Sequence, residues 1–236
     1  MNRKMKQALK YTFHAPAPAR KSAFLKKYRR RELGCRDFLL TQAGYIRWWV
    51  WAASVLLFGG VLWLASWQDS GTVWAAAALT PFLALLIVVE NGKSRFYGME
   101  ELELSCRISL RTVVLARMLF LGLFHLLLLG LLIPVIAAWG AVGLFRAGLY
   151  LLTPYLLTAA LGMELTRRCR RQEGLLACGG AAALVSALGL LGGTGLLKLY
   201  LPEFLPWWGG ALAVSLAAVA LELHVELKKT EGLQWN

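Results

Sequence analysis

The sequence predicts an all-α, polytopic membrane protein with six transmembrane helices. Hydrophobic residues make up 58% of the 236-residue chain and charged residues only 17%, against roughly 25% charged residues in a typical soluble domain. Runs of about 20 apolar residues, each long enough to cross a bilayer, recur along the chain. A soluble protein of this length has no interior large enough to bury several such runs.

Short polar or charged connections separate the predicted spans. The spans cover about residues 48–67, 73–89, 113–139, 144–165, 174–197 and 207–223. We expect Asn91 and Gly92 to form a turn at the end of the second span. In the fifth span Gly179, Ala183 and Ala187 recur every four residues, which favours close helix packing within the chain or across a dimer.

Basic residues indicate the orientation of these spans. All but two of the 26 Lys and Arg residues fall in the N-terminal arm, the tail and alternate connections, and the opposite side holds only Arg146 and Lys198. Because cytoplasmic connections are enriched in Lys and Arg, both termini are predicted to be cytosolic. We therefore expect a multi-pass protein of the plasma membrane.

The chain divides into three predicted parts. Residues 1–47 form a basic cytosolic or interfacial arm that includes an amphipathic elbow helix. Residues 48–227 form the transmembrane domain, with a cytosolic loop at 90–112, and residues 228–236 form a cytosolic tail. The arm carries most of the formal net charge of +13. This charge favours anionic lipid as a partner over nucleic acid, for which no groove-reading or base-stacking motif is visible.

The segment 96–118 is charged although it lies between two apolar runs. A charged stripe at helical spacing contains Glu100, Glu103, Arg107 and Arg111. An apolar stripe beside it contains Met99, Leu102, Cys106, Leu110 and Val113. Such a helix, on the cytosolic side and leading into a span, suits docking to a soluble partner. A solvated loop that lies on lipid headgroups is the alternative.

Candidates for a transport pathway lie inside the spans. His125 is the ionisable residue farthest from a span end, and such groups mark functional sites, although a buried, hydrogen-bonded structural His is the other interpretation. Pro81 and Pro154 permit kinks that suit moving helices but also occur in static ones. Ionisable residues nearer to span ends, such as Glu90 and Glu222, are expected to snorkel.

The outer segment LPEFLPWW, residues 201–208, has two interpretations. It forms either a re-entrant hairpin that caps a pathway or a short loop anchored by Trp207 and Trp208. The aromatic side chains suit a membrane interface in both cases.

The chain carries no motif for catalysis. It lacks the H-E-x-x-H, G-x-S-x-G and paired-carboxylate signatures. Its four Cys have no C-x-x-C spacing, so we expect no metal site and interpret them as small apolar residues. Because the phosphate-binding loop G-x-x-x-x-G-K-[ST] is absent, any ATP hydrolysis would reside in a partner subunit. We therefore expect neither an enzyme nor a bound cofactor.

The layout of these predicted elements resembles that of the ABC-2-type permeases. These proteins are the membrane subunits of ABC transporters, mostly exporters. The strings FHAPAPARKSAFLKKY, QAGYIRWWVWAAS and MEELELSCRISLRTVVLARM are similar to those of bacterial membrane proteins assigned near such transporters. The basic elbow, the six spans with both ends inside, the helical loop after the second span and the Pro-containing outer segment agree with this family.

The resemblance implies a partner and a docking site. In that family the loop after the second span carries a coupling helix that sits in a cleft of a separate ATPase, which binds ATP and Mg²⁺. The implied coupling residues are Phe96, Tyr97, Met99, Glu100, Glu101, Leu102, Glu103 and Arg107. A second, minor cytosolic contact would involve Arg167, Arg168, Arg170 and Arg171. The resemblance also implies a second permease half, identical or not, and the apolar spans favour an amphipathic, lipidic or peptide substrate.

Two other functions are compatible with the sequence. A non-transporting regulatory or accessory protein would use the basic arm to bind a cytosolic partner. A substrate-binding subunit of a vitamin importer would also have about six spans, but it captures substrate with a long outer loop. The connections QDSGT and WGAVG are too short for that task.

Overall fold

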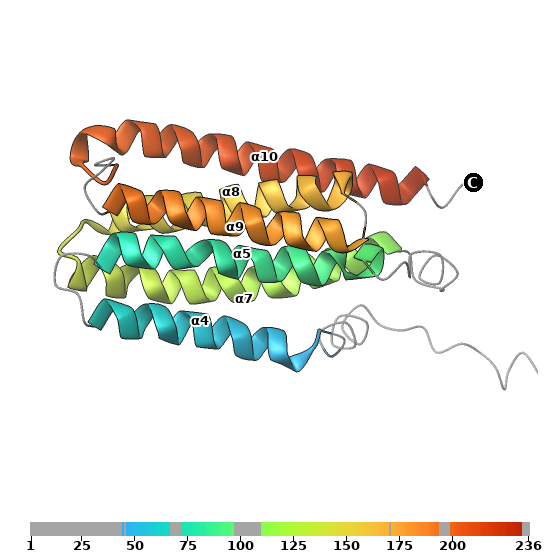
Figure 1. Cartoon of the computed structure of the whole chain (residues 1–236), viewed down its shortest axis with the longest axis horizontal. Helices are drawn as coiled ribbons and strands as arrows, with labels where there is room; N and C mark the ends of the chain where they lie inside the picture. The colour runs from blue at the N-terminus through green and yellow to red at the C-terminus, as the bar shows by residue number, and fades with distance from the viewer. Residues whose placement is uncertain are drawn as a thin grey trace, which may run out of the picture. The chain divides into compact units, whose positions relative to one another are not determined.

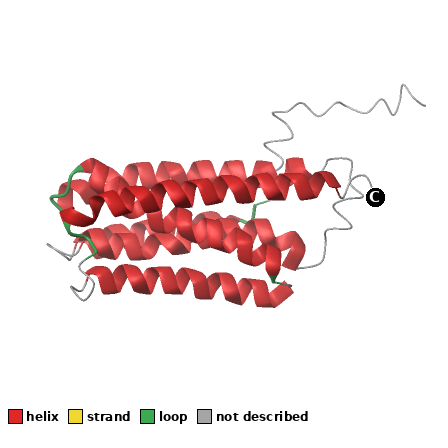
Figure 2. Ribbon diagram, turned by 90° about the horizontal axis from the view of Figure 1, so that it is seen from above, coloured by secondary structure: helices red, strands yellow, loops and turns green. Residues whose placement is uncertain are grey.

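The computed structural model describes residues 44, 46–66, 72–96, 110–169, 171–193 and 199–232. In these residues the regular structure is helical, with short turns between helices (Figure 2). The all-α prediction is therefore confirmed for the described part of the chain. The predicted arm and elbow helix lie outside it, except for residues 44, 46 and 47.

The helices follow the predicted spans closely. They are α4 (Trp48–Ser66), α5 (Thr72–Phe96), α7 (Leu110–Trp139), α8 (Leu144–Arg168), α9 (Arg171–Gly193), the short 3-10 helix η1 (Pro202–Phe204) and α10 (Leu205–Gly232). Among the described residues, α5, α7, α8, α9 and α10 are long and apolar enough to cross a membrane, and α4 contributes a shorter apolar helix. These are the helices of a multi-pass membrane protein.

The chain runs back and forth through a bundle in which α5 is central (Figure 1). Helix α5 packs against α4, α7, α8 and α9, whereas α10 packs mainly on α8. We call the end at which α5 ends and α7 begins the basic end, because Lys93, Arg117, Arg167 and Arg168 lie there. The other end, where α7 ends and α8 begins, is called the aromatic end.

A tight turn joins α7 to α8 at the aromatic end. The Gly140 amide donates to the carbonyl of Ile136 at 2.9 Å, and Ala141 adopts a left-handed conformation with φ of 48°. A Cβ on Gly140 would lie 2.7 Å from the Val73 side chain and 2.9 Å from the Ile136 carbonyl oxygen. Only Gly therefore fits at this position, and the turn holds the start of α5 close to the end of α7.

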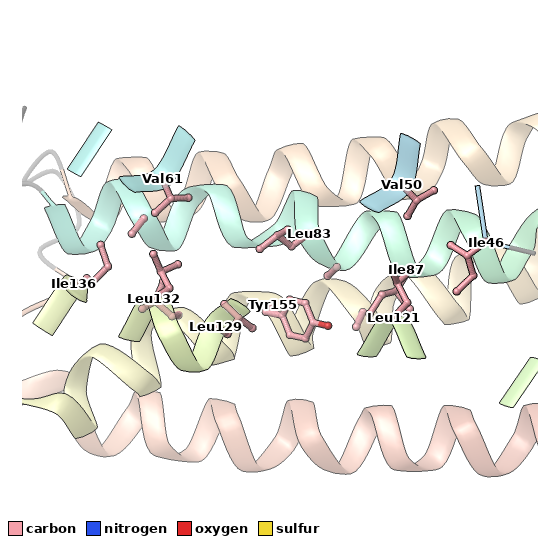
Figure 3. Packing of buried hydrophobic residues seen from close by; sticks show 14 residues of the cluster. Ile46, Val50, Val61, Leu83, Ile87, Leu121, Leu129, Leu132, Ile136 and Tyr155 are labelled. Carbon is pink, nitrogen blue, oxygen red and sulfur yellow. The ribbon is translucent and has the colours of Figure 1, made fainter. Parts of the chain in front are cut away.

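Apolar side chains fill the interface of α4, α5, α7 and α8. Figure 3 shows side chains of this cluster, among them Val50, Leu83, Leu121, Leu132 and Tyr155. Leu83 and Leu132 are fully buried, and Val50 and Leu121 are almost so. The core thus takes one face from each of these four helices.

Large apolar side chains also cover the outside of the bundle. On α7, Leu119, Leu123 and Leu126 are each more than half exposed, and on α10 Val214 is 70% exposed. A helix that is apolar both toward the bundle and away from it is typical of a membrane span. The outer surface therefore matches a hydrocarbon environment.

The predicted turn at Asn91 and Gly92 is wrong. Helix α5 continues through both residues to Phe96, and Lys93 Nζ lies 3.3 Å from Glu90 Oε1, one helical turn back. Gly92 is buried, so packing inside the bundle outweighs the roughly 1 kcal/mol that Gly costs within a helix. Helix α5 therefore ends at Phe96 and α7 begins at Leu110, and residues 97–109 of the predicted loop 90–112 lie outside the described residues.

The stripe of small residues on α9 faces away from the described bundle. Ala183 and Ala187 are exposed, and a Cβ on Gly179 would meet nothing within 4 Å. The adjoining side of α9 packs on α5, where Ser186 Oγ donates to the carbonyl of Ala78 at 2.6 Å. Of the two predicted alternatives for this stripe, packing within the chain is therefore wrong for the described residues.

Candidate functional site

The predicted coupling segment lies almost wholly outside the described residues. Phe96 is the last residue of α5, whereas Tyr97, Met99, Glu100, Glu101, Leu102, Glu103 and Arg107 fall within 97–109. Their role in docking therefore stays a prediction. The structure gives the two helices to which this segment is joined, α5 and α7.

The Arg residues of the second predicted cytosolic contact differ in their environments: one is paired inside the bundle and another is exposed. Arg167 pairs with Glu164 on its own helix, and its Nη2 lies 3.2 Å from Glu222 Oε1 on α10. Arg168 also pairs with Glu164, but its side chain is 75% exposed. Arg170 lies outside the described residues, and Arg171 begins α9. Arg167 therefore links α8 to α10, whereas the side chain of Arg168 is accessible to a partner.

Two further charged residues at the basic end are buried. Glu90 on α5 is 3% exposed and Arg117 on α7 is 6% exposed. The expected snorkelling of Glu90 is wrong, because its carboxylate pairs with Lys93 within the same helix and stays inside the bundle. Both amide atoms of neighbouring Asn91 are buried and make no hydrogen bond with the described residues. The basic end is thus polar in its interior and not only at its rim.

A polar contact crosses the middle of the bundle between α4 and α7. Ser54 Oγ lies 2.9 Å from His125 Nε2, and both residues are fully buried. The ring of Tyr155 on α8 lies edge-on to His125, with 6.2 Å between ring centroids. The interpretation of His125 as a buried, hydrogen-bonded residue is therefore confirmed. Ser54 was not predictable from the sequence, because one Ser in an apolar helix carries no distinguishing pattern.

The contacts of Ser54 indicate which nitrogen of His125 carries the proton. Ser54 Oγ also lies 2.9 Å from the carbonyl oxygen of Val50, which only accepts. The single hydroxyl proton serves Val50, so Nε2–H of His125 donates to Ser54 Oγ. In the neutral ring Nδ1 is then a bare acceptor, and it is buried without a hydrogen-bond partner among the described residues. A buried acceptor that receives no hydrogen bond lowers the free energy of unfolding by about 1–3 kcal/mol.

The predicted pathway residues His125, Pro81 and Pro154 lie at one level of the bundle. A Cβ on Gly162 would lie 2.7 Å from Val88, so these two residues face each other across α5 and α8. The two helices run in the same direction (Figure 1). Pro81 and Tyr155 lie the same number of residues before Val88 and Gly162, respectively. Pro81 on α5 is therefore level with Tyr155 on α8, whose ring is a neighbour of His125.

Both prolines are buried in packed helices. Proline at position 81 cannot donate to the carbonyl of Ala77, and the hydroxyl of Thr80 donates to that carbonyl instead, at 2.9 Å. Pro154 lies between Thr153 and Tyr155, which are both buried. In this structure the prolines therefore pack within the bundle.

Three aromatic rings pack together at the aromatic end. Tyr150 lies edge-on to Tyr200 and Trp208, with centroids 5.0 and 5.1 Å apart, and the latter two rings stack at 5.5 Å. Trp208 Nε1 donates to the carbonyl of Leu199 at 2.8 Å. Burial raises the pKa of the Tyr200 hydroxyl, so that group stays protonated at neutral pH.

The segment 201–208 forms one short turn and then enters α10. Helix η1 (Pro202–Phe204) is followed directly by α10 at Leu205. Trp207 is 76% exposed, whereas Trp208 is anchored by Tyr150 and Leu199. These residues have the form of the short anchored loop rather than the re-entrant hairpin: Trp208 packs on the bundle, and the exposed ring of Trp207 is available to the membrane interface.

Replacement of Ser54 by Ala is expected to destabilise the bundle. It removes the contact between α4 and α7 and leaves His125 Nε2 without a partner, at a cost of about 1–3 kcal/mol. Ser215→Ala is the matched control, because Ser215 is equally buried but donates only to Leu212 in its own helix. Thermal unfolding of both purified variants measures the difference. Equal melting temperatures would contradict a stabilising α4–α7 contact.

No family model, curated protein or solved structure matches the chain.

Proposed function

We propose that the chain is the permease subunit of a bacterial ABC exporter with six spans. Helix α4 would be the remaining span, since its 19 residues extend about 28 Å at 1.5 Å per residue, close to the hydrocarbon thickness of about 30 Å. The sequence resemblance to ABC-2-type permeases supports this proposal, and the long apolar helices are compatible with it.

The basic end would face the cytosol, and both termini with it. Lys93, Arg117, Arg167, Arg168 and Lys228 belong to the ends of α5, α7, α8 and α10 that meet there. Positive residues are retained on the cytosolic side during insertion. The basic arm, residues 1–47, would then contact anionic lipid of the inner leaflet.

The central position of α5 is the observation that best supports coupling to an ATPase. Residues 97–109, the proposed docking segment, join α5 directly to α7. Helix α5 packs against four other helices, and packed helices transmit displacement because the interior is dense. A partner that moves residues 97–109 would therefore move the core of the bundle. The partner would supply ATP, Mg²⁺ and hydrolysis.

The remaining contacts follow from the same arrangement. Arg168, Arg170 and Arg171 would form the second contact with the ATPase, since Arg167 is bound to Glu164 and Glu222. The exposed stripe of small residues on α9 is available to a second permease half, identical or not. An amphipathic, lipidic or peptide substrate suits a bundle whose outer surface is apolar.

Replacement of Glu103 by Lys tests this proposal. The tagged chain, purified in mild detergent, is expected to bring down an ATPase identified by mass spectrometry, and Glu103→Lys is expected to lose it through charge reversal in the docking segment. Glu173→Lys is the matched control, because this exposed residue in the first turn of α9 changes the same charge elsewhere at the basic end.

Two outcomes would count against the proposal. If no ATPase accompanies either sample, a regulatory or accessory function is favoured and the basic arm becomes the docking candidate. If both variants retain the ATPase equally, the enzyme docks outside residues 97–109.

A further inference from the structure

The unpaired nitrogen of His125 lies in the middle of the bundle, far from both ends. His125 is fully buried, and its Nδ1 has no hydrogen-bond partner among the described residues. Its ring neighbours are Phe124 and Tyr155, each with a centroid 6.2 Å away. A neutral imidazole nitrogen with a free lone pair accepts a hydrogen bond and donates none.

Hydroxyl groups near the level of His125 already donate their protons to other acceptors. Four buried hydroxyls donate to main-chain carbonyls of their own helices, namely Ser54 to Val50, Thr80 to Ala77, Thr153 to Leu149 and Thr158 to Pro154. Thr80 and Thr153 directly precede the prolines that lie level with His125. These four hydroxyls therefore have no proton left for Nδ1, and Tyr155, whose ring lies edge-on to His125, makes no hydrogen bond to that atom, so a ligand that binds Nδ1 has to supply the proton.

The location of the buried charged residues indicates whether a ligand that donates to His125 is charged or neutral. The buried charged residues of the described chain, Glu90 and Arg117, belong to the basic end. A cation at His125 would lose its hydration without a carboxylate to replace it, which is far more costly than burying a neutral hydroxyl that is hydrogen-bonded. Leu121 and Leu129, one helical turn before and after His125 on α7, belong to the apolar core. An uncharged donor on an apolar body fits this environment.

The position of α4 indicates where such a ligand enters. Helix α4 packs only against α5 and α7 among the described helices, and its outer face exposes Leu56 and Trp63. Because His125 is closed off, access requires α4 to move away from α7. A molecule dissolved in the bilayer would then reach Nδ1 sideways.

We propose that His125 Nδ1 binds the hydroxyl group of an uncharged, lipid-soluble amphiphile that enters between α4 and α7. Ser54 is the positioning residue, because it holds the His125 proton on Nε2 and leaves Nδ1 free to accept. The identification of this amphiphile as transported cargo rests on the proposed function. Its binding does not, because the site is complete within this chain.

Photolabelling with a long-chain alcohol tests the proposal on the purified chain in phosphatidylcholine nanodiscs, without any ATPase. The probe is hexadecanol with a diazirine in its chain. Labelled peptides are expected to include the residues around Ser54 and His125. Unlabelled hexadecanol is expected to compete about two- to tenfold better than hexadecyl methyl ether, which keeps the chain but lacks the O–H donor.

Variants and a charged competitor sharpen the result. His125→Phe keeps a ring of similar size and is expected to lower labelling of these peptides by about two- to tenfold, whereas Leu126→Phe on the exposed face of α7 leaves it unchanged. Should His125→Phe not fold, the alcohol and ether competition in the unmodified chain decides. Equal competition by alcohol and ether, or labelling confined to exposed residues, would overturn the site. Stronger competition by hexadecylammonium would overturn the uncharged class.

Discussion

Replacement of Gly162 by Leu is expected to push α5 and α8 apart. A Cβ at this position would already lie 2.7 and 2.9 Å from the two methyl groups of Val88. Val88 is β-branched and 2% exposed, so its side chain has little freedom to rotate away. Overpacking of this kind costs about 1–3 kcal/mol. The melting temperature of the detergent-purified chain is expected to fall accordingly.

Gly180→Leu is the control for this effect. Gly180 is also inside a helix, but a Cβ there would meet nothing within 4 Å, and the residue is exposed. Both changes gain helix propensity equally, so the difference in melting temperature isolates the contact with Val88. A similar melting temperature for the two variants would show that α5 and α8 do not approach each other at Gly162.

Replacement of Arg167 by Ala is expected to loosen α10. The change leaves Glu222 without its contact to α8, and Glu222 Oε2 already has no hydrogen-bond partner among the described residues. Breaking a fully buried ion pair costs about 3–5 kcal/mol and an exposed pair about 0–1 kcal/mol. The side chains of Arg167 and Glu222 are 25% and 15% exposed, so we expect about 1–3 kcal/mol in thermal unfolding.

Two companion variants separate pairing from packing at this position. Arg168→Ala removes a guanidinium that is 75% exposed and pairs with the same Glu164, so little change is expected. Adding Glu222→Gln to Arg167→Ala is expected to restore part of the stability, because a neutral amide needs no counter-charge. Equal losses for Arg167→Ala and Arg168→Ala, with no recovery in the double variant, would contradict a specific link between α8 and α10.

The positions of the helices were predictable because hydropathy alone marks them. Helices α4 and α8 begin at Trp48 and Leu144, where the predicted spans begin. Helix ends were less predictable. The dipeptide Asn91–Gly92 has the composition of a turn, yet α5 continues through it, because the surrounding helices bury Gly92 and local propensity is the weaker effect.

The neighbours of each helix were not predictable from the sequence. These helices are apolar on both faces, so periodicity does not reveal which side packs inward. The stripe of Gly179, Ala183 and Ala187 therefore looked like a packing face, although it points outward. The contacts of His125 with Ser54 and of Arg167 with Glu222 join residues far apart in the chain. A single sequence carries no signal for such pairs.

The order of synthesis does not match the order of packing around α5. Ribosomes complete α5 before α7, α8 and α9, yet these later helices cover most of its surface. During that interval Glu90, Thr80 and Pro81 lack the neighbours that bury them in the finished bundle. We therefore expect the nascent chain to need shielding, at the insertion machinery or by a membrane chaperone, until α9 has been made. Truncation before α9 would leave a degradation-prone fragment, because α5 would still lack one of its covering partners.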